Sequence, residues 1–378
     1  MTRLFSKMPL MAQILWIALK LAIVVFAVFQ ASNVTILYQG FWLNMRIELA
    51  PMEGITTYIY RNAICKYYGG IDTYYSPFIS THQKKRLNFK EIKEILPENN
   101  IGYTLIPQVL TANADEFAFT SGQIEEYGYK HINLNFGCPS GTVVPKGKGA
   151  GVLKDPDALE RLLDAIFSKT NIGISIKTRM GLETPAEWEK LIHVYEKFPI
   201  EELIVHARVR EDFYNGRARI NELSSYDFPD SLKFSYNGDI FSSKDVVKTL
   251  ELFPYAEAVM IGRGLIARPW LASEIANGNS ILGIQTKEGR NALKEFNYAL
   301  IDGYNKIMPG EKNTLFKLKE LWIYLIKSFE REEYSEAVKE IYIPDFKVLP
   351  ETPKAKKLLK SIRKCNSLRE YESIINTL

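Results

Sequence analysis

Short apolar stretches recur along the chain from Arg46 to Ile261, and their residue pattern predicts β-strands. One stretch follows another roughly every 30 residues, which is room for one strand, one helix and two loops. Eight such units in one direction predict a closed (β/α)8 barrel, the TIM barrel, more strongly than a doubly wound open sheet. The predicted strands are Arg46–Ala50, Asp72–Tyr75, Gly102–Gln108, Ile132–Asn135, Gly173–Lys177, Leu203–His206, Lys233–Tyr236 and Ala258–Ile261.

Helical patterns fill the intervals between the strands and continue after the last one. The helix predicted over Asp155–Ser168 begins at an Asp-Pro start signal, and the one over Ser243–Leu250 follows a serine cap. We therefore expect an α/β protein with a catalytic barrel over residues 45–285 and a smaller C-terminal helical domain over residues 286–378. The helices predicted in that domain are Ala292–Met308, Thr314–Glu330 and Tyr334–Ile341.

The first 44 residues differ from the rest. Residues 9–29 are almost wholly apolar, with Lys20 as their one charge, and their length suits a membrane helix or a signal anchor. The interpretation we favour is that the natural chain starts at Met45, directly before the first predicted strand. Only residues 9–29 offer a means of membrane association. We expect a cytoplasmic protein, with anchoring on the cytoplasmic side of a membrane as the alternative.

Composition adds modest constraints. The chain has 378 residues, 46% hydrophobic and 24% charged, with a net charge of +4, so it can bury a large core and is only mildly basic. Cys65, Cys138 and Cys365 are far apart, which gives no disulfide framework and suits a reducing compartment. Neither they nor the four histidines have metal-site spacing, so no metal is expected. We expect a monomer.

Candidate chemistry is concentrated at the end of the fourth predicted strand, in NFGCPSGTVVPKGKGAGVL. Gly137 permits a sharp turn and Pro139 stops the strand, so Cys138 lies at a strand's carboxyl end, where α/β barrels carry active sites. The glycine-rich loop that follows carries Lys146 and Lys148, which favours an anionic ligand. A buried structural cysteine beside a surface turn is the alternative for Cys138 taken alone.

Other strand ends also carry polar residues. Gln108 can pair with the donor and acceptor edge of a heterocycle. Lys177 would point inward, where a lysine needs an anionic partner, either a barrel carboxylate or a negatively charged ligand. Glycine-rich turns follow the last two strands, where such barrels bind phosphate, and Arg263 supplies a counter-charge. These turns are Asn237-Gly238-Asp239 and Gly262-Arg263-Gly264.

These motifs, in this order, resemble the tRNA-dihydrouridine synthases. The matching segments are APMEG, NFGCPS, KGKGAGVL, KTRMG, HAR, NGDI and IGRG. The resemblance implies that FMN is the cofactor, that NADPH or NADH recharges it, and that tRNA is the substrate. Cys138 would be the general acid that protonates uracil C5 while hydride reaches C6. The expected cofactor residues are Pro51, Met52, Glu53, Gln108, Lys177, His206, Asn237, Gly238, Asp239, Gly262 and Arg263, and the expected substrate residues are Asn135, Lys146, Arg179 and Arg208.

The C-terminal part ends in a dense basic run after Pro353. It is either a solvated helix face or a surface that contacts RNA phosphates. The family that this sequence resembles binds tRNA with a C-terminal helical domain, and this favours the second interpretation. The cations are Lys354, Lys356, Lys357, Lys360, Arg363 and Lys364, of which we expect Lys356, Lys357, Lys360 and Lys364 to contact tRNA.

Two other functions fit parts of the pattern. An FMN-dependent barrel dehydrogenase acting on a small pyrimidine such as dihydroorotate would share the barrel and the phosphate site, and the apolar N-terminal segment suits its membrane-linked forms. The basic C-terminal run and the NFGCPS turn argue against it. A non-enzymatic RNA-binding barrel would explain the lysines, but not Gln108, Lys177 and Cys138 at strand ends.

Overall fold

The computed structural model describes residues 45–83, 87–278, 280–337 and 352–378. The apolar segment predicted to be an anchor or a mis-assigned start lies outside the described residues. Within the described ranges, no helix combines the length and apolar character needed to cross a bilayer. Residues Arg46–Leu378 form one compact unit.

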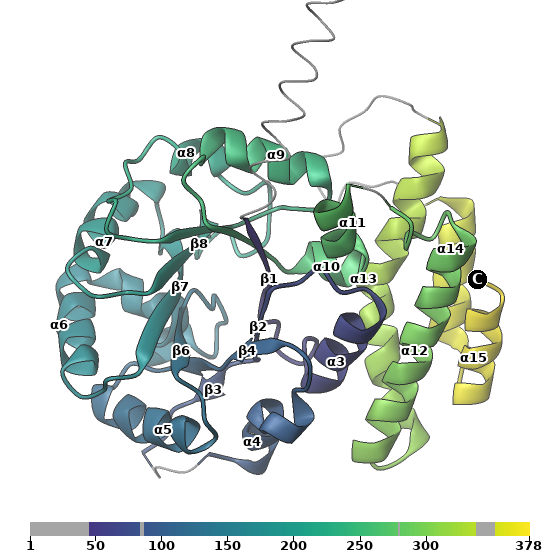
Figure 1. Cartoon of the computed structure of the whole chain (residues 1–378), viewed down its shortest axis with the longest axis horizontal. Coiled ribbons are helices and arrows are strands. Elements are labelled where there is room, and N and C mark those ends of the chain that lie inside the picture. The colour runs from purple at the N-terminus through teal and green to yellow at the C-terminus, as the bar shows by residue number, and fades with distance from the viewer. Residues whose placement is uncertain (1–44, 84–86, 279, 338–351) are drawn as a thin grey trace, which may run out of the picture. The chain divides into compact units, whose positions relative to one another are not determined.

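A parallel sheet forms the centre of this unit and closes on itself (Figure 1). Its order is β3-β5-β6-β7-β8-β9-β10-β1-β2-β4. In this order β2 and β3 are the two halves of one barrel strand, and β4 and β5 are the two halves of the next. Since β2 pairs with β4 and β3 pairs with β5, the two ends of the order belong to the same pair of neighbouring strands, and the sheet is closed. The result is the predicted eight-stranded barrel. The strands are β1 (Arg46–Leu49), β2 (Thr73–Tyr75), β3 (Ile79–Ser80), β4 (Thr104–Ile106), β5 (Gln108–Leu110), β6 (His131–Phe136), β7 (Gly173–Gly181), β8 (Glu202–Val209), β9 (Phe234–Asn237) and β10 (Ala258–Ile261).

Several predicted strand ends were wrong. The third strand does not end at Gln108: Pro107, which has no N–H group, interrupts it, and it resumes as β5. At this break the Ser76 hydroxyl accepts a hydrogen bond from the Gln108 N–H at 3.0 Å. The strands predicted to end at Lys177 and His206 continue to Gly181 and Val209, because β7 and β8 pair with each other beyond those residues.

Helices surround the barrel (Figure 1). Asp155 caps α6 as predicted, since its carboxylate accepts the N–H groups of Asp157 and Ala158. The helix α9 begins after Ser242 as predicted, but the Ser242 hydroxyl caps no backbone N–H group and donates instead to the Asp245 carboxylate at 2.7 Å. The helices are α3 (Tyr58–Tyr67), α4 (Phe89–Ile95), α5 (Ala114–Glu126), α6 (Pro156–Phe167), α7 (Trp188–Tyr195), α8 (Ile220–Leu223), α9 (Ser243–Leu252), α10 (Arg263–Ala267) and α11 (Leu271–Asn277), with 3₁₀ turns η1 (Pro97–Asn99), η2 (Val144–Lys146), η3 (Gly149–Lys154) and η4 (Pro185–Glu187).

The barrel interior is layered. Near the amino ends of the strands, the Tyr75 hydroxyl lies 3.3 Å from carboxylate oxygens of both Glu48 and Glu202. Burial, followed by the proximity of Glu202, raises the pKa of Glu48 well above its usual value, which favours the protonated form of this acid. An apolar layer follows, formed by Ala50, Tyr75, Ile106, Ile204 and Met260. It separates the acidic layer from the polar residues near the carboxyl ends.

Four further helices form the C-terminal region. The helix α12 packs on α3, and α13 packs on α10. A Cβ atom on Gly303 of α12 would lie 2.6 Å from Ile59 of α3, so glycine permits this close approach. The helix predicted over Tyr334–Ile341 was wrong as a separate element, because α13 runs on to Ala337; the rest of it lies outside the described residues. The helices are α12 (Lys287–Ile307), α13 (Glu311–Ala337), α14 (Pro353–Lys364) and α15 (Leu368–Asn376), the last of which was not predicted.

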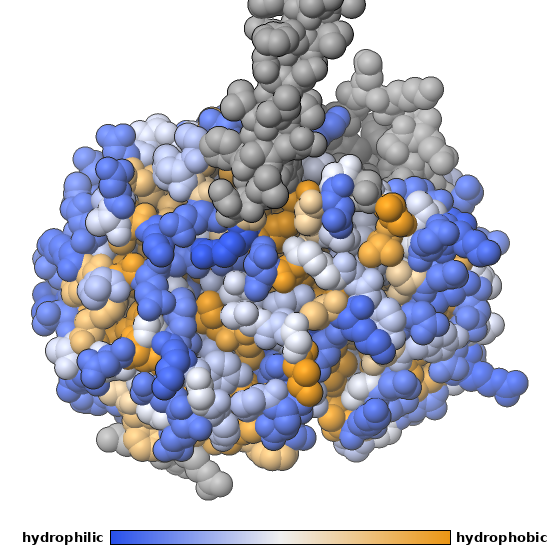
Figure 2. Space-filling view, viewed as in Figure 1, coloured by the Kyte–Doolittle hydropathy of each residue, from blue (hydrophilic) through white to orange (hydrophobic). Residues whose placement is uncertain are grey.

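A buried hydrogen-bonded tyrosine joins three of these helices. The Trp322 indole N–H donates to the Tyr371 hydroxyl at 2.7 Å, and that hydroxyl donates to Asn297 Oδ1 at 2.5 Å. Because these polar groups are buried and paired, they fix α12, α13 and α15 against one another. The surface that α12, α14 and α15 occupy in Figure 1 is largely hydrophilic (Figure 2).

Candidate active site

Cys138 lies in a tightly held turn at the carboxyl end of β6. The backbone N–H groups of Cys138 and Gly137 donate to Asn135 Oδ1 at 2.9 and 3.2 Å. The following loop folds back onto the turn, since the Ala150 N–H donates to the Cys138 carbonyl at 3.0 Å and Gly149 is so close that a Cβ there would lie 2.7 Å from that carbonyl. Burial raises the pKa of the Cys138 thiol, so the thiol is protonated at neutral pH.

Arg179 holds this turn from the next strand. Its Nε donates to the Gly137 carbonyl at 2.8 Å, and its Nη1 donates to the carbonyls of Val209 and Phe213 at 2.9 and 3.0 Å. The predicted role of Arg179 was substrate binding, but its side chain is buried and ties the cysteine turn to the loop after β8. These contacts make it a positioning residue. Its guanidinium also lies over the Tyr214 ring, 5.4 Å from the centroid.

Lys177 and His206 are two further basic side chains at the same end of the barrel. Lys177 Nζ donates to Asn237 Oδ1 at 2.8 Å, and among the described residues no carboxylate lies within ion-pair distance of it. Burial, followed by repulsion from Arg179, lowers the pKa of Lys177 to about 7. Burial and the neighbouring cations hold the pKa of His206 well below its usual value, so its imidazole is neutral.

Asp239 lies between two arginines. Its carboxylate accepts from Arg208 and from Arg263, each at 2.7 Å, and from the Ala218 N–H at 2.8 Å. Arg208 was predicted to bind substrate, but its buried guanidinium lies with the predicted cofactor residues. The Nε of Arg208 has no hydrogen-bond partner among the described residues. A buried donor of this kind requires an acceptor.

The glycine turns after β9 and β10 pack too closely for a side chain. A Cβ on Gly238 would lie 2.1 Å from the Tyr236 hydroxyl, and a Cβ on Gly264 would lie 2.0 Å from the Ile240 carbonyl. The turn after β1 reaches the same place, because Met52 Sδ lies 3.5 Å from the Cβ position of Gly262. The barrel thus brings together the turns after its first, seventh and eighth strands, as predicted from their sequence positions.

Some predicted residues lie further out. The Glu53 side chain is 51% exposed and 3.7 Å from Lys90, and Lys146 is exposed in η2. Lys148 was noted as favouring an anionic ligand, but its Nζ donates to the Thr81 carbonyl at 2.7 Å and so anchors the loop. The four lysines predicted to contact tRNA are exposed on α14, whose buried Ala355 and Ile362 belong to the opposite side.

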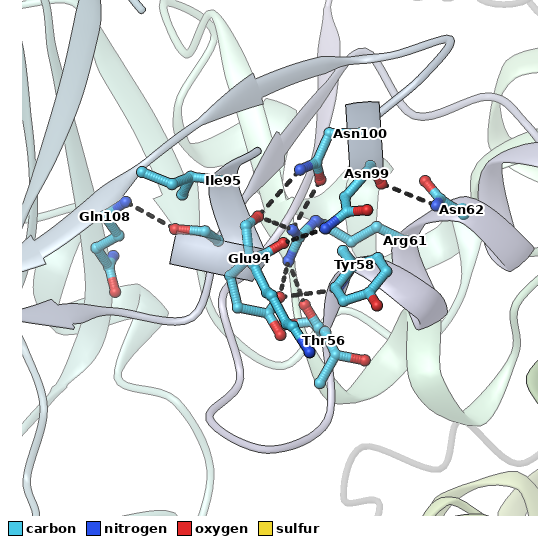
Figure 3. Close-up of polar contacts among 12 residues, drawn as sticks. Thr56, Tyr58, Arg61, Asn62, Glu94, Ile95, Asn99, Asn100 and Gln108 are labelled. Atoms are coloured by element: carbon cyan, nitrogen blue, oxygen red, sulfur yellow. Dashed lines mark hydrogen bonds and ion pairs between the residues drawn. The ribbon is translucent and has the colours of Figure 1, made fainter. Parts of the chain in front are cut away.

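A buried ion pair that the sequence did not reveal supports the turn after β1 (Figure 3). The Arg61 side chain is fully buried and lies 3.2 Å from the Glu94 carboxylate. It also donates to the carbonyls of Thr56 and Glu94, both at 2.6 Å. Thr56 in turn accepts the Met52 N–H on its hydroxyl at 2.8 Å. The position of Met52 therefore depends on Arg61, and only a fold that brings α4 beside α3 supplies the partner carboxylate.

Comparison with known proteins decides the family. The sequence model described as "Dihydrouridine synthase (Dus)" matches residues 48–304. The chain belongs to the dihydrouridine synthase family. The resemblance expected from the sequence motifs is thereby confirmed. The family match begins within β1, extends through β10 and continues into α12.

Curated members of the dihydrouridine synthase family match most of the chain. The tRNA-dihydrouridine synthase B of Pasteurella multocida is 29% identical over 239 residues, which cover 61% of this chain and 69% of that protein. The tRNA-dihydrouridine synthase B of Vibrio vulnificus is 27% identical over 297 residues, which cover 74% and 88%. The tRNA-dihydrouridine(16) synthase of Neisseria meningitidis is 26% identical over 294 residues, which cover 75% and 86%.

Proposed function

We propose that this member of the dihydrouridine synthase family reduces the C5=C6 bond of uridines in tRNA, with bound FMN as the cofactor and NADPH or NADH as the reductant. The observation that carries the proposal is the half-buried thiol of Cys138 at the same end of the barrel as a cluster of cationic side chains. The family match and the names of the relatives favour tRNA over a small pyrimidine such as dihydroorotate.

The residues fit FMN. Lys177 has no anionic partner among the described residues and lies near Arg179, which suits the electron-rich edge of a flavin ring. The turns with Gly238 and Gly262, together with Arg263, suit its phosphate. The chemistry that FMN would supply when bound by these residues is the hydride that uracil C6 receives. The other residues proposed to hold FMN are Pro51, Met52, Glu53, Gln108, His206, Asn237 and Asp239, and Arg208 is added to them from its position.

The contribution of the protein's own side chains to the reaction would be to donate a proton. Cys138 would hold its thiol proton until uracil is bound and would then donate it to C5. Asn135 has less capacity to bind uracil than expected, because its oxygen already accepts two backbone N–H groups and its Nδ2 donates to Gln108 at 2.8 Å. One Nδ2 hydrogen remains for a uracil carbonyl. A uridine must be unstacked to reach this depth.

Around this centre we propose the broader organisation expected from the sequence: catalysis by residues 45–285, tRNA binding by residues 286–378, action as a monomer and location in the cytoplasm, where tRNA is found. The test of the function is direct. The purified protein with FMN, NADPH and unmodified tRNA should form dihydrouridine, detected as a gain of two mass units in a nuclease fragment. Protein that binds FMN but never converts tRNA would contradict the proposal.

FMN affinity should fall as the pH rises above about 7. Lys177 has a pKa of about 7 without a ligand, and an electron-rich group beside its Nζ would raise that pKa. Between the two values binding takes up one proton, so affinity should fall by up to about tenfold per pH unit. Fluorescence titration of FMN between pH 7 and 9 measures this. Lys177→Met should bind more weakly and show no such slope, whereas Lys190→Met, at an exposed site, should match the wild type.

Replacing the exposed lysines of α14 should weaken tRNA binding. Each lysine–phosphate interaction that the substitutions remove lowers the salt slope by about one unit, so tRNA affinity should decrease and depend less on salt. Reduction of FMN by NADPH should not change. A filter-binding series in increasing salt is the measurement, and equal affinity and slope would place the RNA surface elsewhere. The variant carries Lys356→Ala, Lys357→Ala, Lys360→Ala and Lys364→Ala, and its charge-matched control replaces the exposed barrel residues Lys130, Lys190, Lys197 and Lys233.

A further inference from the structure

A chain of buried side-chain amides runs from the cysteine turn into the barrel. Asn135 Nδ2 donates to Gln108 Oε1 at 2.8 Å, and Gln108 Nε2 donates to Asn133 Oδ1 at 2.7 Å. Asn133 Nδ2 then donates to the Ser175 hydroxyl at 2.8 Å. Gln108, Asn133 and Ser175 are completely buried. The chain thus crosses β5, β6 and β7 without access to solvent.

The direction of this chain is fixed at one end. The backbone N–H groups of Gly137 and Cys138 can only donate, so Asn135 must turn its oxygen toward them and its NH₂ toward Gln108. Gln108 must therefore present its oxygen to Asn135 and its NH₂ to Asn133. The orientation of each buried amide is set by the amide before it, because a reversed amide would place oxygen against oxygen and leave donors unpaired.

We propose that Asn133 is a positioning residue: together with Asn135 it holds the buried amide of Gln108, and it thereby supports, from inside the barrel, the turn that carries Cys138. This rests on the roles proposed above for Cys138 and Gln108. Asn133 touches neither reacting group. Its contribution is to hold the Nε2 of Gln108 and so to keep the Oε1 of that amide on Asn135, beside the residues proposed to hold the flavin.

Loss of Asn133 should therefore have two measurable effects, one on flavin binding and one on the turn that carries Cys138. Without its oxygen, Gln108 Nε2 is left without a partner in a buried site, and the amide is held only by its hydrogen bond from Asn135. Gln108 then ceases to fix Asn135, and the hydrogen bonds that Asn135 makes to the cysteine turn loosen. These two effects can be measured separately, on the flavin and on the thiol.

Asn133→Leu, similar in volume but without polar atoms, is the test. We expect its FMN dissociation constant, from fluorescence titration, to rise about tenfold, which corresponds to the loss of one hydrogen bond in a buried site. In flavin-free protein, iodoacetamide should alkylate Cys138 at least about threefold faster, measured peptide by peptide with Cys65 as the internal reference. Asn133→Asp should keep both values near wild type, because it still accepts from Gln108 and Ser175 can donate to its second oxygen.

The matched control is Asn297→Leu, which removes a buried amide from the helical region and should lower thermal stability without changing either value. Unchanged FMN binding and alkylation in Asn133→Leu, or failure of Asn133→Asp to restore them, would overturn the proposal. If Asn133→Leu does not fold, Ser175→Ala, which removes the last acceptor, should shift both values in the same direction, and no shift would overturn it. Wild-type protein that binds no FMN would defeat the proposed function, while the alkylation of Cys138 would still test the amide chain.

Discussion

Replacing Cys138 by alanine should slow the oxidation of reduced flavin by tRNA by roughly 10²–10⁴-fold, the usual effect of losing a general acid. Burial keeps this thiol protonated, which is the form that can donate to uracil C5. FMN binding and its reduction by NADPH should remain near normal, because the hydrogen bonds that shape the turn use the backbone of Cys138. Single-turnover stopped-flow absorbance, with prereduced enzyme mixed with unmodified tRNA, is the measurement.

The chain provides its own controls for this variant. Cys65 lies on α3, with its thiol 3.7 Å from the Gly102 carbonyl, and Cys365 is buried at the end of α14. Neither lies at a strand end, so Cys65→Ala and Cys365→Ala should leave flavin oxidation by tRNA at the wild-type rate. The tRNA should also still bind to Cys138→Ala. Wild-type rates in Cys138→Ala would mean that Cys138 is structural and that another group supplies the proton.

Replacing Glu94 by alanine should lower the free energy of unfolding by about 3–5 kcal/mol, because it leaves the charge of Arg61 buried without its partner. The same carboxylate also accepts the Tyr58 N–H at 2.8 Å, at the start of α3. The turn that carries Met52 should loosen as well, since Arg61 holds it through Thr56. Urea denaturation followed by tryptophan fluorescence gives the unfolding free energy, and FMN titration reports on the turn.

An exposed ion pair serves as the control for the buried Arg61–Glu94 pair. Glu160 pairs with Lys197 at 2.7 Å, but both side chains are well exposed, so Glu160→Ala should change stability by less than about 1 kcal/mol. The double variant Arg61→Met/Glu94→Leu should recover much of the stability that Glu94→Ala loses, because two apolar side chains leave no unpaired charge. Equal losses for Glu94→Ala and Glu160→Ala would show that the Arg61–Glu94 pair does not act as a buried ion pair.

The barrel was predictable because its signals are local. Short apolar runs separated by helical stretches predicted eight strands, and the β10 prediction, Ala258–Ile261, matches the structure at both ends. Glycine and proline marked where strands stop, which located the turn with Cys138 and the turns near Gly238 and Gly262 at one end of the barrel. Parallel strands in a closed barrel share that end, so positions far apart in sequence could be assigned to one site.

The interaction partners of buried charged side chains could not be predicted, because tertiary packing determines them and no local sequence pattern indicates them. Arg179 and Arg208 were predicted to reach substrate, yet both are buried, one holding the cysteine turn and the other paired with Asp239. The length of β7 and β8 depends on each strand finding the other as a neighbour, and Arg61 depends on a carboxylate that α4 supplies. A side chain taken out of water must be paired with whatever the folded chain places beside it. Residue type and strand position therefore foretell that a charged group lies at the site, while the three-dimensional arrangement alone decides whether it contacts a ligand or holds the protein in place.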